Sequence, residues 1–344
     1  MVLMDQKMVF DSPQKGRMGV FSRIFAGAVA VFLCAAVGGC SDAPPASRPP
    51  TVVATTTIVA DLVRQIAADR VEIESLMGAG IDPHSYRPTP RDADRLARAD
   101  LIVASGLHLE GKLAELLQRM SRRTPVVFAA EVVAESSRLE AADGIPDPHV
   151  WFDLALWAAC IEPTVKALSD LVPEAAAEFA EAGAQYRATL LENHAEVQSA
   201  IAAIDEQQRV LVTAHDAFRY FGRAYGIEVV GVQGVSTESE AGLADINRLV
   251  DLLVQRQVPA VFVETSVPDR SVRAICEGAA AKGHTVETGG RLYSDALGEP
   301  GSGADTLVLA IRANVQVICD ALGADGDERQ AERTPAAEEA SETQ

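Results

Sequence analysis

The stretch that most constrains the fold runs from Pro173 to Gln207. Proline at its start, Glu174 and Glu178 near its beginning, and a composition dominated by Ala, Glu, Gln and Leu predict one long helix. At about 1.5 Å per residue this helix would be about 50 Å long, which is more than a single small domain needs. We therefore expect residues 173–207 to form a rigid spine between two lobes, with a binding site in the cleft between the lobes.

Short apolar runs that read as strands alternate with helical patterns on both sides of the spine, in residues 51–172 and 208–323. This alternation predicts parallel sheets with helical crossovers. A chain of 344 residues that is 48% hydrophobic is also long enough for two cores. The predicted fold is α/β, with two lobes that each contain a parallel sheet of about four strands flanked by helices, joined by one long rigid helix.

The N-terminus has the composition of an export signal. Lys15 and Arg17 precede an apolar run at 24–37 that is too short to span a membrane as a stable helix. Two glycines then stand directly before Cys40, as in a bacterial lipobox. Residues 1–39 are therefore predicted to be a signal peptide and Cys40 to carry a lipid. The alternative is an ordinary secretory signal with an incidental cysteine.

Two further segments lack the pattern of a folded core. Residues 40–50 are rich in proline and small polar residues, which predicts a tether between the lipid and the folded chain. Residues 324–344 are acidic without apolar periodicity and are predicted to be disordered.

The formal net charge of -19 argues against nucleic-acid binding, since phosphate requires a basic surface. The predicted location is periplasmic or otherwise extracytoplasmic, with the lipid in a membrane.

A pentapeptide with the pattern Asp-Pro-His, any residue, aromatic occurs twice, ending in Tyr86 and in Trp151. Proline restricts the backbone just before the imidazoles of His84 and His149, and the aromatic ring can cover one side of each, as suits a metal ligand. A single histidine in a loop is more often a surface or hydrogen-bonded residue. Two histidines with the same flanks indicate a shared role.

Three more polar residues stand at or beyond strand-like runs. His215 follows the run at 210–213, at the carboxyl end of a strand, where open α/β sheets place their ligand sites. Glu264 ends the run at 260–264 and could either support a ligand or act as a helix-cap acceptor. Asp295 lies in a loop, and its spacing alone favours a turn or cap residue over metal ligation.

Six motifs, in the same order, resemble those of the TroA-like metal receptors of bacterial ABC importers. They occupy residues 82–86, 106–110, 147–151, 213–218, 234–238 and 292–296. The resemblance implies two α/β lobes joined by a long helix, which agrees with the expectation from the sequence pattern. It also implies four metal ligands, and three residues discussed above are candidates to support them. The implied ligands are His84, His149, His215 and Asp295, and the supporting candidates are Tyr86, Trp151 and Glu264.

The function implied by the resemblance is capture of one divalent ion, Mn²⁺ or Zn²⁺, as cargo. A monomeric receptor would deliver the ion to an ABC permease that an intracellular ATPase drives. Many zinc-dedicated members of the family have a histidine-rich loop, whereas residues 131–146 contain no histidine. Because such a site binds zinc more tightly than manganese in solution, affinity alone does not identify the physiological ion.

Two other functions fit part of this pattern. A zinc-dependent hydrolase can also use three nitrogens and a carboxylate, but catalytic zinc keeps a position open for water, and the chain has no His-Glu-x-x-His helix. A surface adhesin is the second alternative, because this family has sometimes carried that label. We expect a receptor without enzymatic activity.

Overall fold

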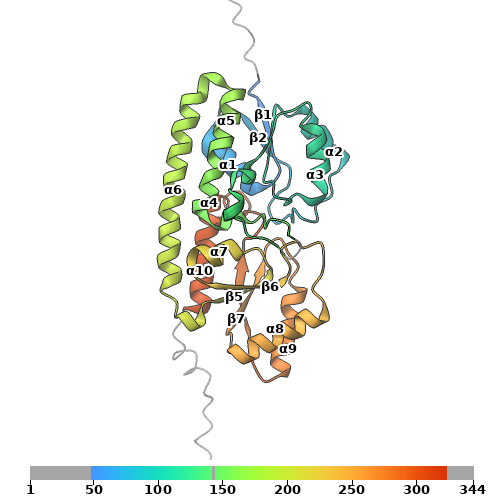
Figure 1. The fold of residues 1–344 in the computed structure, drawn as a ribbon, viewed down its shortest axis with the longest axis vertical. Coiled ribbons are helices and arrows are strands. Elements are labelled where there is room, and N and C mark those ends of the chain that lie inside the picture. Colours follow the sequence, from blue (N-terminus) through green and yellow to red (C-terminus); the bar gives the residue numbers. More distant parts are fainter. Residues whose placement is uncertain (1–47, 142–143, 324–344) are drawn as a thin grey trace, which may run out of the picture. The chain divides into compact units, whose positions relative to one another are not determined.

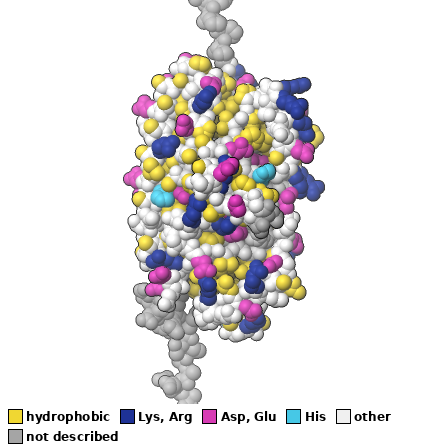
Figure 2. All heavy atoms as spheres, viewed as in Figure 1, with side chains coloured by type: hydrophobic (Ala, Val, Ile, Leu, Met, Phe, Trp, Pro, Cys, Tyr) yellow, Lys and Arg dark blue, Asp and Glu magenta, His cyan; other side chains and the backbone are white. Residues whose placement is uncertain are grey.

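The computed structural model describes residues 48–141 and 144–323. The predicted signal peptide, Cys40, most of the tether and the acidic C-terminal segment lie outside the described residues. Among the helices that are described, none combines the length and the apolar character needed to cross a membrane. Acidic and basic side chains are mixed over the face drawn in Figure 2.

The first lobe contains a four-stranded parallel sheet in the order β2-β1-β3-β4. Its two central strands are short apolar runs that are buried on both faces, as expected for a parallel sheet covered by helices. Val52 faces a core that includes α1 and α5, and the next residue, Val53, faces a core that includes α2 and α3. The elements are β1 (Thr51–Ala54), α1 (Thr57–Ala67), β2 (Glu72–Ser75), α2 (Pro90–Arg98), β3 (Leu101–Ala104), α3 (Ala114–Met120), β4 (Val126–Phe128), α4 (Leu154–Trp157) and α5 (Ile161–Leu171).

The spine is α6 (Ala176–Ala202), which runs beside helices of both lobes in Figure 1. It is 27 residues long and therefore shorter than the predicted helix at both ends. Pro173–Ala175 forms a separate 3-10 turn, and the helix ends before Asp205. The Asp205 carboxylate accepts the backbone N–H of Gln207 at 2.9 Å and begins another short turn, which competes with continuation of the helix.

The second lobe contains four strands that are hydrogen-bonded as two parallel pairs, β5-β6 and β7-β8, with β5 in contact with β7. Helices α8 and α9 pack on one face of these strands, and α7 and α10 pack on the other together with the spine. The expected α/β architecture is thus present in both lobes. The elements are β5 (Val210–His215), α7 (Arg219–Tyr225), β6 (Glu228–Gln233), α8 (Leu243–Arg256), β7 (Ala260–Glu264), α9 (Arg270–Ala281), β8 (Glu287–Leu292) and α10 (Leu307–Leu322).

The predicted position of the last strand is wrong. Strand β8 lies further along the chain, and the pattern missed it because the strand contains two glycines. Glycine has low strand propensity, so the pattern indicated a strand only at 285–287. A Cβ on Gly289 would lie 2.8 Å from the Phe262 ring, and one on Gly290 would lie 2.6 Å from Val317 of α10. The glycines therefore allow α10 to pack close to the strand, and β8 leads directly into the Asp295 loop.

The largest apolar core is shared by the two lobes. Buried side chains of β1, α1 and α5 in the first lobe belong to the same cluster as Phe221 of α7 and Ile311 of α10 in the second. Along α6, the buried residues recur every three or four positions, so that one stripe of the spine faces this cluster. The spine is therefore packed into the core of both lobes along its length.

Candidate metal centre

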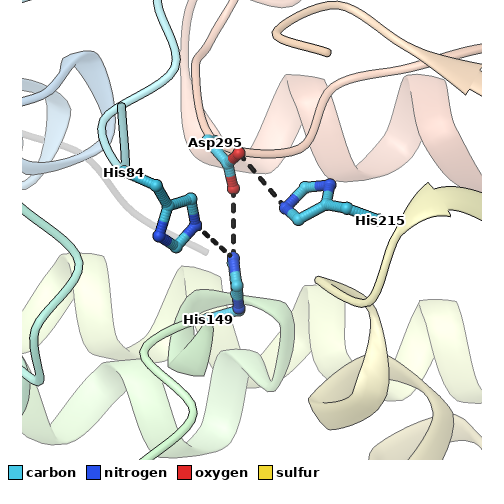
Figure 3. Close-up of side chains that lie close together, drawn as sticks. All are labelled: His84, His149, His215 and Asp295. Carbon is cyan, nitrogen blue, oxygen red and sulfur yellow. Dashed lines mark hydrogen bonds and ion pairs between the residues drawn. The ribbon is translucent and has the colours of Figure 1, made fainter. Parts of the chain in front are cut away.

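The four predicted ligands come from four separate segments that end at one place (Figure 3). His84 lies in the loop between β2 and α2, and His149 lies just before a 3-10 turn that leads to α4. His215 is the last residue of β5, and Asp295 lies in the loop after β8. Three of the segments thus follow the carboxyl ends of parallel strands, which is where open α/β sheets hold their ligands.

The side chains converge with their possible ligand atoms toward one point (Figure 3). The Nε2 atoms of His84 and His149 are 3.2 Å apart. The two oxygens of Asp295 are each 3.3 Å from an imidazole, Oδ1 from Nε2 of His149 and Oδ2 from Nε2 of His215. Metal–ligand bonds of about 2.0 to 2.1 Å in a tetrahedron separate neighbouring ligand atoms by about 3.3 Å. These spacings therefore suit a cation at the centre.

The site is closed to solvent. His84 is 3% exposed, and His149, His215 and Asp295 are 0% exposed. Nε2 of His215 and Oδ1 of Asp295 are buried without a hydrogen-bond partner among the described residues. Buried polar atoms without partners are costly in a folded protein. A bound cation would satisfy them.

Two of the imidazoles are oriented by carboxylates on the side away from the centre. Asp147 Oδ1 lies 2.8 Å from Nδ1 of His149, and Glu264 Oε2 lies 2.6 Å from Nδ1 of His215. Glu264 also accepts the backbone N–H of His215 at 2.8 Å. Such carboxylates fix the ring orientation and leave Nε2 to face a metal. Glu264 therefore lies where a supporting group was predicted, although its effect on binding stays a prediction.

The charges in the site shift the pKa values of the imidazoles apart. Burial lowers the pKa of His149, but the hydrogen bond with Asp147 and the nearby negative charge of Asp295 outweigh burial and raise the pKa to about 9. The pKa of His215 is also raised, because the charges of Glu264 and Asp295 outweigh burial. Burial lowers the pKa of His84 to about 4, and the attraction of Asp295 offsets this only in part.

The two Asp-Pro-His motifs look alike in sequence but differ in their contacts. Both aspartates accept the backbone N–H of the following histidine, but only Asp147 also contacts the ring. Asp82 instead accepts hydrogen bonds from Ser85 and Thr237. The sequence reasoning missed both aspartates as functional candidates. Their presence two residues before each histidine was the available signal, since aspartate readily accepts a backbone N–H two residues further on.

The two aromatic residues of these motifs also differ. Trp151 lies edge-on to His149, with ring centroids 5.2 Å apart, and its indole N–H donates to the carbonyl of Ser294 at 3.1 Å. It therefore contacts one ligand and the neighbour of another. Tyr86 donates to Asp92 of α2 at 2.7 Å. Its role beside the metal stays a prediction, and the hydrogen bond places its hydroxyl on the N3 residue of the capping box that begins α2.

A sequence profile described as the periplasmic component A of a zinc-uptake complex matches residues 52–321. The chain belongs to this family. The manganese-binding lipoprotein MntA of Bacillus subtilis is 42% identical over 299 residues, which are 86% of this chain and 98% of that protein. The zinc-binding protein TroA of Treponema pallidum is 41% identical over 273 residues, which are 79% of this chain and 89% of that protein.

The solved structure of periplasmic TroA from Treponema pallidum matches with a TM-score of 0.78, covering 79% of this chain and 99% of that one. The resemblance inferred from the six motifs is thus confirmed, as is the α/β fold class. Members of this family are binding components of uptake systems and not enzymes. The alternative of a zinc-dependent hydrolase is therefore wrong.

Proposed function

We propose that the protein is the receptor of an ABC importer and that it captures one Mn²⁺ or Zn²⁺ ion with His84, His149, His215 and Asp295. The observation that carries this proposal is the convergence of their ligand atoms, which all lie within 4.8 Å of one another in a buried site. Three imidazoles and a carboxylate form a donor set for a borderline divalent cation. The carboxylates of Asp147 and Glu264 would add negative charge behind the imidazoles.

Both oxygens of Asp295 point toward the centre, so bidentate binding would give five coordination positions (Figure 3). Five positions suit manganese as well as zinc, since a carboxylate chelate relaxes the tetrahedral geometry. The names of the two relatives described above favour neither ion, because one is a manganese-binding and the other a zinc-binding protein at nearly equal identity. Mn²⁺ and Zn²⁺ are therefore both candidates for the bound ion.

The proposed partners follow from the family. A relative from Streptococcus mutans, which is 29% identical over 290 residues, is named a metal ABC transporter substrate-binding lipoprotein. We propose that this protein likewise acts as a monomer outside the cytoplasm, held to a membrane by a lipid on Cys40. It would deliver its ion to a permease that an intracellular ATPase drives.

The test is elemental analysis of the mature protein, purified from its native compartment without chelators, beside a double variant with His215→Ala and Asp295→Ala. We expect about one equivalent of manganese or zinc in the parent and little in the variant. Absence of stoichiometric metal from both proteins would remove the ligand assignment. Thermal unfolding of the variant serves as the control for folding.

The adhesin alternative is separable from metal capture. If adhesion were an independent function, a variant that has lost all four ligands would still bind host cells. Loss of host-cell binding together with metal binding would remove that alternative.

A further inference from the structure

Hydrogen bonds between the two lobes connect the segments that carry His149 and His215. The backbone N–H of Leu139 donates to the Tyr220 hydroxyl at 2.9 Å, and that hydroxyl donates to the carbonyl of Asp147 at 3.0 Å. Tyr220 belongs to α7, which follows His215 closely in the chain. The segment that carries His149 is therefore fixed to the part of the second lobe that carries His215.

The Asp295 loop belongs to the second lobe, but residues of the first lobe hold it on both sides. Before Asp295, the carbonyl of Ser294 accepts the indole N–H of Trp151. After it, the backbone N–H of Leu297 donates to the Thr57 hydroxyl at 2.8 Å. Further along, the N–H of Leu307 donates to the buried carboxylate of Asp61 at 2.9 Å. These bonds make Asp295 part of the same fixed frame as His149.

The loop that carries His84 is attached differently. Within the described chain, one hydrogen bond joins this loop, residues 76–89, to the second lobe: the Thr237 hydroxyl donates to Asp82 Oδ2 at 2.6 Å. The other oxygen of Asp82 accepts the backbone N–H of His84 at 2.9 Å, so Thr237 is connected to the ligand through one carboxylate. Beside this contact, Lys112 and Glu238 form an ion pair of 3.0 Å between the lobes.

His84 also differs from the other two imidazoles in its own surroundings. No carboxylate in the described chain is hydrogen-bonded to its ring in the way that Asp147 is to His149. It is the one ligand with measurable exposure, 3% of its surface. The loop around it contains Gly78 and Gly80, and Gly80 has a φ of 70°, which favours glycine. Glycine therefore permits the turn at this position of the loop.

We propose that Thr237 and the Lys112–Glu238 pair form a latch that holds the His84 loop closed over the ion. The ion enters and leaves when the latch breaks and the His84 loop moves, while His149, His215 and Asp295 stay in place. Thr237 is thus a positioning residue that acts on His84 through Asp82. This inference rests on the proposed function, because it assumes that His84 is a metal ligand.

The test is stopped-flow measurement of metal binding and release with the full mature chain, using Mn²⁺ or Zn²⁺ and a chelating dye. Thr237→Val preserves the shape of the side chain and removes the hydroxyl that donates a hydrogen bond to Asp82. The latch must open both when the ion binds and when it is released. Because the variant weakens the latch, we expect the binding and release rate constants each to rise about tenfold. The dissociation constant should then change less than about threefold. The matched control is Thr189→Val, at an exposed position of α6.

The outcomes separate the possible roles of Thr237. An unchanged release rate in Thr237→Val would overturn the latch. Faster release with an unchanged binding rate, and a Kd weakened in proportion, would also overturn it, since the residue would then only maintain the bound geometry. Failure of the parent protein to bind either ion would instead remove the proposed function, which is a distinguishable result.

The ion pair gives a second and independent test. Lys112→Glu places two like charges together and should raise the release rate about threefold at low salt. Adding Glu238→Lys restores an opposite pair and should return the rate to that of the parent. Both effects should fade at about 1 M salt, because Lys112 and Glu238 are each nearly half exposed and salt screens such pairs. Equal rates in the single and double variants at low salt would remove the ion pair from the latch.

Discussion

Replacing Glu264 by glutamine tests whether a buried carboxylate strengthens metal binding through an imidazole that it contacts. Glu264 is 0% exposed, and its two oxygens accept the backbone N–H and contact the ring Nδ1 of His215. Glutamine fills nearly the same volume but has no charge and one acceptor oxygen. The backbone bond or the ring bond would therefore be lost together with the charge.

The magnitude follows from two opposing Coulomb energies. An ion bonded to Nε2 of His215 would lie about 6.5 Å from the Glu264 carboxylate, where a double charge gains about 5 kcal/mol at an effective dielectric constant of about 20. In the metal-free protein the raised pKa of His215 keeps a proton on the ring, and that single charge, about 4.5 Å away, gains about 3.5 kcal/mol. The difference of about 1.5 kcal/mol corresponds to about a tenfold loss of affinity.

The assay is competition between the protein and a chromophoric chelator at constant pH and ionic strength. We expect Glu264→Gln to raise the Kd about tenfold, at the low end of the 10- to 100-fold losses that such supporting groups give. Glu162→Gln, the same change at an exposed position of α5, is the matched control. An affinity within about twofold of the parent in a folded Glu264→Gln variant would refute the reasoning.

Three further predictions concern pH, packing and a hydrogen bond. The metal-binding constant should rise with pH between about 6 and 8, because His149, with a pKa of about 9, and His215, with a raised pKa, carry protons that ligation displaces. Calorimetry in buffers of different ionisation enthalpy should show release of about two protons per ion, and no release would contradict this. Gly183→Ala should lower the free energy of unfolding by about 1 kcal/mol, since overpacking costs more than the gain in helix propensity. A Cβ there would lie 2.8 Å from a methyl group of α5, and urea unfolding beside Ser199→Ala on the exposed side of α6 measures the loss. Trp151→Phe removes the indole N–H that donates to the Asp295 loop and leaves a cavity beside the smaller ring, so it should cost about 2 to 3 kcal/mol of stability. An unchanged urea midpoint would show that the bond is replaced.

The elements predicted well are those whose sequence signal is local. The spine was recognisable because strong helix formers continue over many residues, and β1 and β3 because four apolar residues in a row are typical of a covered parallel strand. The repeated Asp-Pro-His pattern made His84 and His149 candidate ligands before any spatial information. His215 became a candidate by its position at the end of an apolar run, and the ligand roles of all three stay predictions.

The features that sequence did not reveal depend on contacts between distant segments. Strand β8 was misplaced because its glycines are explained only by the close approach of α10. Asp295 was raised above a turn residue only by the family resemblance, since its neighbours in sequence give no sign that two imidazoles lie 3.3 Å away. The contact between Thr237 and Asp82 joins residues that are 155 positions apart, and no local pattern predicts it.

The shared apolar core has a consequence for how this protein can be divided. Because α6 contributes one buried stripe to both lobes, cutting the chain on either side of the spine would expose part of that stripe in each fragment. Neither half would then keep a complete core, and we expect the halves to aggregate when they are expressed alone. Grafting one lobe onto a relative would meet the same obstacle unless the spine were transferred with the surfaces that pack against it. We therefore expect the two lobes to fold as one cooperative unit.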